Sequence, residues 1–492
     1  MTTYLSVYIG SLLLAMLITP LVIYIAQALK IYDEPGARKV HACSVPRIGG
    51  VAVFLSVIAL VVTVLFLDNS VGDAFRRIRI QMVMLLATSS LVFVLGFIDD
   101  LRGIRARHKL LAQVMAAAVL CLAGVRINSL NFVNLFTLRF GWVSFPITIF
   151  WVVAITNAVN LIDGLDGLAA GICAVTCAVI AAFAFNSGQP VMVILMLALL
   201  GSLSGFLLFN FNPARIFLGD CGSMFLGFFL ASASVICAMK TGTVVALALP
   251  ALALGLPIFD TVFSMFRRFL KRRGIMSPDR GHLHHRLVDM GFRQRHVVIA
   301  MYAITVIAAG LGMFMMLARG AGAIGIFFCV LLLLALVFHL AGAVRLRDTI
   351  AGLRKKYVIS RQMKLEMENF EKAELHFRQA ETFEQWWQAT CVAADKMGFV
   401  RSALPLTNRD GSKRILVWQQ NDTDIQPYEI SEMTLPVRDR RAGSLLKLEV
   451  QVYANGSLES AGRRVALFAR LIEEHSVGNL PKQHQTYLDT RL

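Results

Sequence analysis

The chain has 492 residues, of which 57% are hydrophobic and only 16% are charged, and its mean hydropathy is +0.65. This composition excludes a soluble globular protein of that length. The formal net charge of +17 could suggest a nucleic-acid partner. In a membrane protein, however, an excess of lysine and arginine is typical of cytoplasmic loops that face anionic lipids or anionic substrates. We therefore expect a membrane protein that does not bind nucleic acid.

Apolar runs of about 17–25 residues, long enough to cross the hydrocarbon core as helices, recur up to residue 344. The first run, from Tyr4 to Leu29, lacks a basic n-region followed by a cleavage site, which favours a membrane helix over a signal peptide. We predict an all-α polytopic membrane domain over residues 1–344, with about eleven transmembrane helices. Their predicted positions are 4–29, 49–67, 80–98, 110–125, 144–160, 168–185, 190–208, 222–239, 243–262, 297–317 and 321–343.

The basic residues between these runs predict the orientation of the chain, because loops rich in lysine and arginine stay inside. If the loop after the first span lies inside, the inside loops hold most of the basic residues, from Arg38, Lys39 and Arg47 to the cluster between Arg267 and Arg295. In the opposite orientation the inside loops hold fewer, chiefly Arg76, Arg77, Arg79, Arg126 and Arg139. We therefore expect a multi-pass membrane protein with its N-terminus outside and its C-terminus in the cytoplasm.

The composition changes beyond Val344. Residues 345–380 form a charged connector that favours helix, and residues 381–492 are predicted to be a small cytoplasmic α+β domain. Its β-prone runs are "KRILVWQQ", "EISEMTLPVR" and "LLKLEVQVYA", and a helical run, "ESAGRRVALFARLIEEH", follows them. This domain contains no catalytic constellation, and its tryptophans are expected in its core. We expect it to regulate the protein or to dock a cytoplasmic partner.

Six aspartates lie at the predicted ends of membrane helices, and the orientation above places all six on the cytoplasmic face. Ionisable groups at membrane depth are functional by default, although any one of them could instead hold helices together, and for Asp260 both readings stay open. The six are Asp99, Asp100, Asp163, Asp166, Asp220 and Asp260.

The segment "GFIDDLRGIRARHKLLAQ" ends an apolar run with Asp99 and Asp100 and continues with four basic residues, the last of which is Lys109. Adjacent side chains diverge on a helix, so the two carboxylates can serve one ligand only if the helix ends there. One is expected to bind a cation while the other accepts a proton. The alternative is a pair of solvated charges at a helix end.

The segment "NAVNLIDGLDGLAAG" places Asn157, Asn160, Asp163 and Asp166 three residues apart. On one helix they would form a single polar stripe that drifts slowly around the axis. In "FNPARIFLGDCGS", Pro213 breaks a helix and two glycines bracket Asp220 where the next apolar run starts. A carboxylate at such a position suits Mg²⁺, which takes one or two carboxylates and completes its shell with substrate phosphates.

The segment "RRFLKRRGIMSPDRGHLHHRL" combines a basic run with Arg280, His282, His284 and His285. A zinc site is one reading, but Asp279 is the only further ligand at suitable spacing. Recognition of a diphosphate by imidazole and guanidinium groups fits better. Together with the acids and asparagines, these groups suit Mg²⁺-assisted phosphoryl transfer from an anionic soluble donor to a membrane-borne acceptor.

These motifs support a family resemblance. "GFIDD", "NAVNLIDGLDGLAAG", "PARIFLGDCGS" and "DRGHLHHRL" resemble, in that order, the signature segments of the polyprenyl-phosphate N-acetylhexosamine-1-phosphate transferases. "DEPGARKVHACSVPRIGG" and "HLHH" resemble the WecA/TagO branch of that family and not the MraY branch. The C-terminal domain has no counterpart in the common core of the family.

The resemblance implies an enzyme of the bacterial inner membrane that moves a sugar 1-phosphate from a UDP-N-acetylhexosamine to undecaprenyl phosphate and releases UMP. It implies that Asn160 and Asp220 hold Mg²⁺, with Mn²⁺ as the alternative, and that Asp99 and Asp100 position or deprotonate the lipid phosphate. Lys109 would pair with phosphate. The remaining residues, taken as substrate-binding, are Asn157, Asp163, Asp166, Arg280, His282, His284 and His285. The sugar, with GlcNAc as the default, and the formation of a homodimer stay open.

Two alternative functions belong to other classes. A cation-coupled transporter also places acids within a polytopic bundle, but near the bilayer midplane on broken helices. A membrane phosphatase would need a histidine nucleophile and a basic phosphate motif on one loop. An alanine substitution at Asp220 that left activity unchanged would contradict the transferase interpretation.

Overall fold

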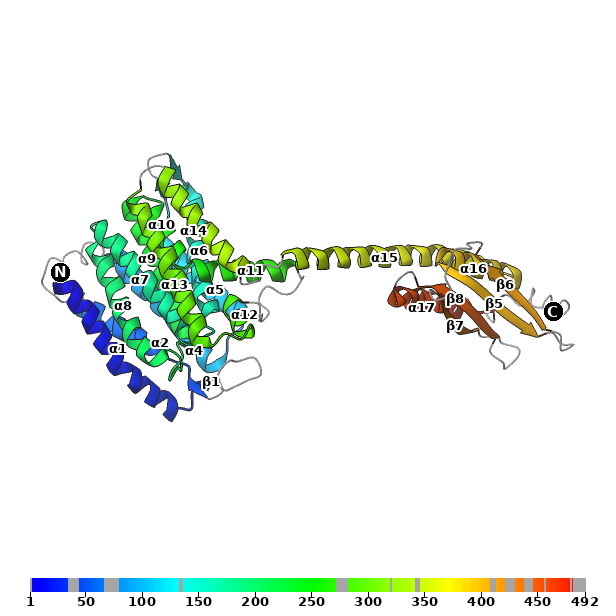
Figure 1. Ribbon diagram of the computed structural model, residues 1–492, viewed down its shortest axis with the longest axis horizontal. Helices are drawn as coiled ribbons and strands as arrows, with labels where there is room; N and C mark the ends of the chain where they lie inside the picture. The colour runs from blue at the N-terminus through cyan, green and yellow to red at the C-terminus, as the bar shows by residue number, and fades with distance from the viewer. Residues whose placement is uncertain are drawn as a thin grey trace. The chain divides into compact units, whose positions relative to one another are not determined.

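The computed structural model describes residues 2–33, 44–65, 79–131, 136–270, 282–318, 321–340, 346–407, 413–420, 430–437, 446–454, 457–477 and 480. Contacts between Cα atoms divide the chain into two compact units, Met1–Thr349 and Ile350–Leu492. The first unit is a bundle of helices and the second contains a β-sheet (Figure 1).

The first unit is built almost entirely from helices, as its apolar composition predicts. Its helices, in chain order, are α1 (Thr2–Ala28), α2 (Gly50–Leu65), α4 (Arg79–Arg102), α5 (Ala106–Leu122), α6 (Ser144–Ile162), α7 (Leu168–Asn186), α8 (Pro190–Asn210), α9 (Gly219–Thr241), α10 (Val245–Ala253), α11 (Gly255–Leu270), α12 (Leu283–Asp289), α13 (Gln294–Met313) and α14 (Ala321–Leu340). Two short antiparallel pairs accompany them, β1 (Tyr32–Asp33) with β2 (Val45–Pro46) and β3 (Ser129–Asn131) with β4 (Thr137–Arg139).

Eight of the described helices are long and apolar enough to cross a membrane. The bent pair Val245–Ala253 and Gly255–Phe269 makes a ninth candidate if the two helices are one span broken by a 75° bend. A further apolar helix, Gly50–Val64, is shorter. The prediction of a helical, multi-span unit is therefore confirmed, while the count of eleven spans stays a prediction.

Helix α9 is the central element of this unit. All of its residues from Cys221 to Ala238 are buried, and it packs against α2, α4, α6, α7 and α10. Glycines allow α2 and α9 to approach closely, because a Cβ atom on Gly50 would lie only 2.2 Å from the backbone nitrogen of Gly222. The surrounding helices thus fix the position of the first turn of α9, which carries Asp220.

The segment that precedes α2 is tied to the start of α9 by backbone hydrogen bonds. The N–H of Phe217 donates to the carbonyl of Pro46 at 2.7 Å, and the N–H of Gly50 donates to the carbonyl of Leu218 at 2.7 Å. These bonds bring Arg47 next to the first turn of α9.

Helix α6 ends at Ile162, before both aspartates of the "NAVNLIDGLDGLAAG" segment. Asp163 is its C-cap residue, and Gly167 takes a left-handed conformation with φ of 77°. The expectation of a single polar stripe from Asn157 to Asp166 was therefore wrong beyond the end of α6. The glycines end the helix, so the two aspartates lie in a turn between α6 and α7.

The second unit is a four-stranded sheet with helices packed on one side. Its elements are α15 (Leu346–Arg378), which begins within the first unit, α16 (Phe383–Lys396), β5 (Phe399–Thr407), β6 (Lys413–Gln419), β7 (Ile430–Val437), β8 (Leu446–Tyr453) and α17 (Leu458–Glu474). The strands are all antiparallel, in the order β6-β5-β8-β7. Trp386, Phe399 and Phe468 are buried in its core. The prediction of a small C-terminal α+β unit is confirmed.

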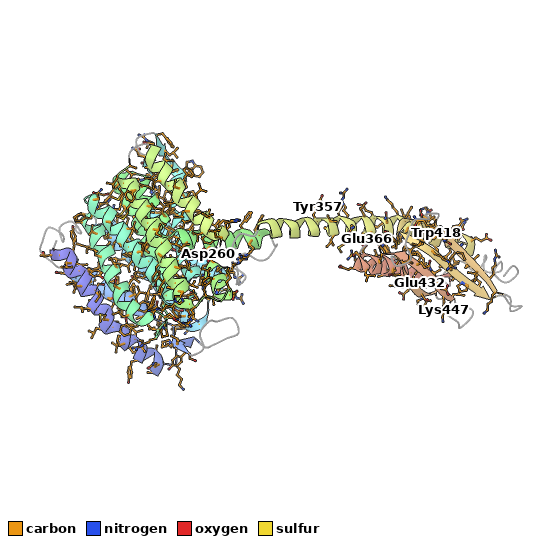
Figure 2. The ribbon with its side chains drawn as sticks, viewed as in Figure 1. Asp260, Tyr357, Glu366, Trp418, Glu432 and Lys447 are labelled. Atoms are coloured by element: carbon orange, nitrogen blue, oxygen red, sulfur yellow. The ribbon has the colours of Figure 1, made fainter. Side chains whose placement is uncertain are left out.

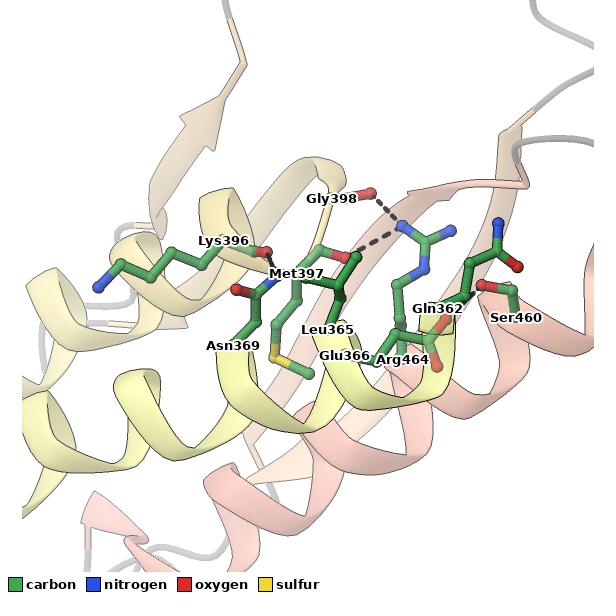
Figure 3. A pocket seen from close by; sticks show the side chains of 9 residues that line it. All are labelled: Gln362, Leu365, Glu366, Asn369, Lys396, Met397, Gly398, Ser460 and Arg464. Carbon is green, nitrogen blue, oxygen red and sulfur yellow. Dashed lines mark hydrogen bonds between the residues drawn. The ribbon is translucent and has the colours of Figure 1, made fainter. Parts of the chain in front are cut away.

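A cavity of about 210 Å³ lies where α15, α16 and α17 meet (Figure 3). Arg464 fills one side of it and donates hydrogen bonds to the carbonyls of Met397 and Gly398, both at 3.0 Å. Asn369 donates to the carbonyl of Lys396 at 2.8 Å. These carbonyls lie at the end of α16 and have no partner within the helix. The polar side chains that line the cavity therefore supply their hydrogen-bond donors.

Candidate active site

Polar side chains from four helix ends converge beside the first turn of α9. Asp99 and Asp100 lie at the end of α4, Lys109 in the first turn of α5, Asn160 near the end of α6 and Asp220 at the start of α9. These five side chains come from four different helices, and hydrogen bonds connect them. We refer to these five residues as the carboxylate cluster.

Lys109 joins two of the acids in the cluster. Its Nζ atom lies 2.7 Å from Oδ2 of Asp99 and 3.3 Å from Oδ2 of Asp220. Burial lowers the pKa of the Lys109 ammonium, but the carboxylates of Asp220 and Asp99 outweigh this effect and raise the pKa above its usual value. The lysine therefore stays charged and balances two carboxylates that face each other.

Asp99 and Asp100 have different surroundings although they are neighbours. Asp99 is 5% exposed, and its other oxygen accepts a hydrogen bond from the N–H of Ile104. Asp100 accepts hydrogen bonds from the N–H groups of Asp220 and Cys221, each at 3.0 Å, one on each oxygen. Arg47 adds two contacts to Oδ1 of Asp100, at 2.8 and 3.1 Å. Asp100 thus caps the N-terminus of α9.

Asn160 fixes the orientation of Asp220. Its Nδ2 atom donates to Oδ1 of Asp220 at 2.6 Å and to Oγ of Ser223 at 2.9 Å. Ser223 in turn donates to the carbonyl of Gly219 at 3.0 Å. These contacts use the nitrogen of the amide, so its oxygen is the atom suited to hold a cation.

Asp163 lies close enough to the cluster to be affected by its charges. Burial, together with the carboxylates of Asp220 and Asp100, raises the pKa of Asp163 well above its usual range. Arg47 opposes this shift but does not cancel it. A cation bound at the cluster would favour ionisation of Asp163, because an opposite charge stabilises a carboxylate.

Two of the predicted site residues have described partners elsewhere. Asp166 accepts hydrogen bonds from Nδ2 of Asn212 at 2.8 Å and from the N–H of Ala214 at 3.1 Å, so it holds the segment between α8 and α9. Asn157 donates to Oε1 of Gln113 on α5 at 2.6 Å. These contacts connect helices and loops around the cluster.

The histidines form a second group beside the turn that follows α6. His282 and His284 are buried, and the ring centroids of His284 and His285 lie 4.3 Å apart. A Cβ atom on Gly164 would lie 2.7 Å from Nε2 of His284. His284 therefore touches the same turn that carries Asp163. Arg280, predicted with them, lies outside the described residues.

The ring of His284 is neutral at physiological pH. Burial lowers its pKa to about 3; Asp260 opposes this shift, while His285 and His282 add to it. Its Nδ1 atom is buried without a hydrogen-bond partner among the described residues. His284 is thus packed into the structure, and its assignment with His282 and His285 as a substrate-binding residue stays a prediction.

Two residues that contribute to the geometry were missed by the sequence analysis as site residues. Arg47 binds Asp100 and its Nη2 atom lies 4.0 Å from Asp220. Ser223 accepts from Asn160. Both belong to segments that carry the family resemblance, "PRIGG" and "GDCGS", which was the available signal.

The donor set of the cluster fits a hard divalent cation. Mg²⁺ prefers carboxylate and amide oxygens and keeps room for substrate phosphates. Asp220 and Asn160 supply such oxygens side by side, at an end of the bundle where five charged or polar groups meet. Asp100 is the acid least suited to this task, because its oxygens cap the N-terminus of α9 and also accept both contacts of Arg47.

Another set of metal-type side chains lies in the second unit, where ligand atoms of Glu374, Glu474 and His475 gather within 4.8 Å. Arg378 pairs with Glu374 at 2.7 Å and Arg470 pairs with Glu474 at 2.8 Å. Both carboxylates therefore have cationic partners already, and we interpret the group as an ion-pair network.

Residues 82–238 match the family model described as glycosyl transferase family 4. A probable undecaprenyl-phosphate N-acetylglucosaminyl 1-phosphate transferase of Bacillus subtilis (strain 168) is 38% identical over 299 residues, 60% of this chain and 80% of that protein. A decaprenyl-phosphate N-acetylglucosaminephosphotransferase of Mycobacterium leprae is 34% identical, over 58% and 76% of the two chains. A phospho-N-acetylmuramoyl-pentapeptide-transferase of Desulforudis audaxviator is 31% identical, over 62% and 95%.

Proposed function

This chain belongs to glycosyl transferase family 4, and we propose that it transfers N-acetylglucosamine 1-phosphate from a UDP-sugar to undecaprenyl phosphate. The predicted family is confirmed, and identity is higher to the N-acetylglucosamine 1-phosphate transferases than to the pentapeptide transferase. The product, a lipid diphosphate sugar, would initiate a cell-envelope polysaccharide. The reported relatives are transferases, and they give the transporter alternative no support.

The reaction joins two anions, so the protein must bring like charges together. An oxygen of the lipid phosphate attacks the phosphorus that carries the sugar, and the bond from that phosphorus to the bridging oxygen breaks. UMP leaves with that bridging oxygen and the bonding electron pair. Catalysis of such a transfer depends mainly on positioning and on compensation of charge. The observation that carries the proposal is the carboxylate cluster, whose acids contact Lys109 within it and Arg47 beside it.

Asp99 is the acid best placed to act on the acceptor. It is free of the helix-capping role that occupies Asp100, and it shares Lys109 with Asp220. We assign to Asp99 the removal of a proton from the lipid phosphate or its orientation for attack. Lys109 has three N–H donors, two of which address carboxylates, so one is left for a phosphate oxygen.

Asp220 and Asn160 would hold Mg²⁺, or Mn²⁺ in its place. When bound, this cation would offset the negative charge of the donor diphosphate and make UMP a better leaving group. The chain's own contribution is to fix these two oxygen ligands: Asn160 orients Asp220, and Asp100 secures the helix that carries Asp220.

The nucleotide-sugar would lie on the side of the histidines. His284, in the segment from His282 to His285, packs against Gly164 in the turn that carries Asp163. We assign donor recognition to this side, with Arg280 as a phosphate partner, and a supporting role to Asp166 and Asn157. We further propose that the protein lies in the bacterial inner membrane with the cluster facing the cytoplasm, where the UDP-sugar is found.

A direct experiment tests this function. Purified protein in detergent receives labelled UDP-GlcNAc, undecaprenyl phosphate and Mg²⁺, and both labelled lipid and released UMP are measured. We expect equal amounts of the two products, and loss of both with EDTA or with Asp220→Ala. Absence of labelled lipid with UDP-GlcNAc and with the other UDP-N-acetylhexosamines would contradict the proposal.

The order of steps has its own test. We propose direct attack by the lipid phosphate, so UDP-GlcNAc alone should release no UMP. Incubation of the enzyme with a donor labelled in the sugar phosphate, without lipid, followed by denaturation, should leave the protein unlabelled. A phosphorylated aspartate trapped in this way would instead show a two-step reaction.

A further inference from the structure

Asp260 is a buried acid that the proposed chemistry leaves unused. It lies on α11, among the helices of the first unit (Figure 2), and it is 4% exposed. Its Oδ2 atom lies 2.9 Å from Nδ1 of His282, and its Oδ1 atom accepts a hydrogen bond from the N–H of Leu283 at 2.9 Å. One carboxylate therefore binds both the side chain of a histidine and the backbone of the residue that follows it.

This contact determines which nitrogen of His282 carries a proton. A carboxylate only accepts hydrogen bonds, so Nδ1 of His282 must be the donor. In the neutral ring, Nε2 then bears the lone pair and can accept a hydrogen bond. Ser264 lies 3.4 Å from the same Nδ1 atom, which is a longer contact than the one to Asp260.

The same carboxylate helps to place the histidine segment against the turn that follows α6. Nδ1 of His284 lies 3.8 Å from Oδ2 of Asp260, and Nε2 of His284 sits over Gly164. The rings of His282 and His284 are nearly parallel, with an interplanar angle of 14°. Asp260 is thus connected through two histidines to the turn that carries Asp163.

We propose that Asp260 is a positioning residue for the donor side of the active site, which holds His282 with its proton on Nδ1 and presents Nε2 to the nucleotide-sugar. The proposal rests on the proposed function. Asp260 itself touches no substrate in this scheme, and it acts through His282.

The substitution Asp260→Asn tests the proposal because it keeps the shape of the side chain. The asparagine oxygen can still accept from Leu283, while its NH₂ group faces Nδ1 of His282 as a donor. The neutral ring must then carry its proton on Nε2, which turns the acceptor into a donor. We expect kcat/KM for UDP-GlcNAc to fall by about 10–100-fold, by analogy with the removal of a carboxylate that orients a metal-binding histidine. The KM for undecaprenyl phosphate should stay within about twofold of wild type.

A double-mutant cycle separates this role from a general structural one. In a His282→Gln background, Asp260→Asn should cause no further loss, because the residue through which Asp260 acts is gone. The matched control is Thr261→Val, since Thr261 is the buried neighbour of Asp260 and its hydroxyl has no partner among the described residues. This control should keep wild-type kinetics. If Asp260→Asn does not accumulate, Asp260→Glu, which displaces the carboxylate by one methylene, is measured in the same two backgrounds.

The outcomes distinguish the inference from the function on which it rests. If the wild-type protein forms no labelled lipid, the proposed function fails. If the wild type is active, the inference is overturned by an Asp260→Asn variant with unchanged kcat/KM, by an equal loss in the His282→Gln background, or by a loss confined to the KM for the lipid. A loss for the UDP-sugar that disappears in the His282→Gln background supports it.

Discussion

The backbone N–H of Asp220 donates a hydrogen bond to the side chain of Asp100 at 3.0 Å. The acid that ends α4 is therefore the cap of α9, the buried central helix of the bundle. This relationship separates the tasks of two consecutive aspartates. Asp100 maintains the position of Asp220, whereas Asp99 faces Lys109 and is the acid to which the proposed function assigns the chemistry.

The first prediction follows from this division. Asp100→Asn should lower the free energy of unfolding by about 1–3 kcal/mol, because one amide oxygen cannot accept both N–H bonds and a buried donor loses its partner. Asp99→Asn should abolish most of the activity with a smaller loss of stability, since its oxygen can still accept from Ile104. Thermal unfolding in detergent, measured beside the transfer assay, checks both. Equal destabilisation by the two variants would contradict the assignment.

A second prediction concerns Lys109. Lys109→Met should lower kcat by at least about 100-fold, by analogy with the loss of a donor that stabilises developing charge. It should also lower the Mg²⁺ concentration needed for half-maximal thermal stabilisation, because Asp99 and Asp220 lose their shared counter-charge. The control is Arg107→Met, which removes the same charge from an exposed position on α5. Weaker Mg²⁺ stabilisation in Lys109→Met would mean that the lysine does not compete with the cation.

A third prediction addresses the metal ligands. Asn160→Ala should raise the Mg²⁺ concentration needed for half-maximal activity by at least about 10-fold, the scale of losing a group that orients or holds a metal. Ser223→Ala is the matched control, because Ser223 shares a hydrogen bond with Asn160 but supplies no ligand in the proposed site. It should cost about 0.5–1.5 kcal/mol of stability and leave the Mg²⁺ dependence unchanged. A similar Mg²⁺ shift in both variants would argue against Asn160 as a ligand.

The buried ring of His284 predicts a dependence of stability on pH. Its folded pKa of about 3 is below the ordinary value of 6.5, so the unfolded chain takes up a proton that the folded chain does not. The contribution to stability is complete above pH 6.5 and is lost as the pH falls toward 3, with a slope of at most about 1.4 kcal/mol per pH unit. In His284→Gln the free energy of unfolding should depend less steeply on pH, because the unfolded chain then takes up one proton fewer. Unfolding midpoints between pH 4.5 and 7 provide the measurement, and identical slopes for both proteins would exclude the effect.

A fifth prediction concerns the second unit. Arg464 donates hydrogen bonds to the carbonyls of Met397, Gly398 and Tyr453. Arg464→Met should therefore destabilise this unit by about 1–3 kcal/mol, because three partly buried acceptors lose their donor. Arg470→Met is the control, since its pair with Glu474 is exposed and such pairs contribute little. Limited proteolysis of the full chain reads out the difference, and equal sensitivity of both variants would contradict it.

The sequence predicted the helical bundle and the cluster better than it predicted the surroundings of single residues. Runs of apolar residues determine helices directly, since a helix satisfies its own backbone in lipid. Asp99, Lys109, Asn160 and Asp220 were selected because polar groups are rare among such runs, and the structure brings them together.

The missed features depend on contacts distant in sequence. Nothing local in "PRIGG" shows that Arg47 reaches Asp100, and nothing in "GFIDD" shows that the second aspartate caps a helix that begins at Gly219. The strand β5 and the helix α16 were missed as separate elements, since Pro405 interrupts the β-prone pattern and α16 continues a helix-favouring connector. Such features follow from tertiary packing, which local preferences do not encode.

The cap on α9 also has a consequence for the order of folding. Asp100 and Asp220 are 120 residues apart, and Lys109 and Asp220 are 111 residues apart. When α4 and α5 have been synthesised, the two acids of α4 and Lys109 are present, but their partner Asp220 has not yet been made. Because contacts between distant segments form late, the end of the bundle that holds the carboxylate cluster is completed only when α9 packs between its neighbours.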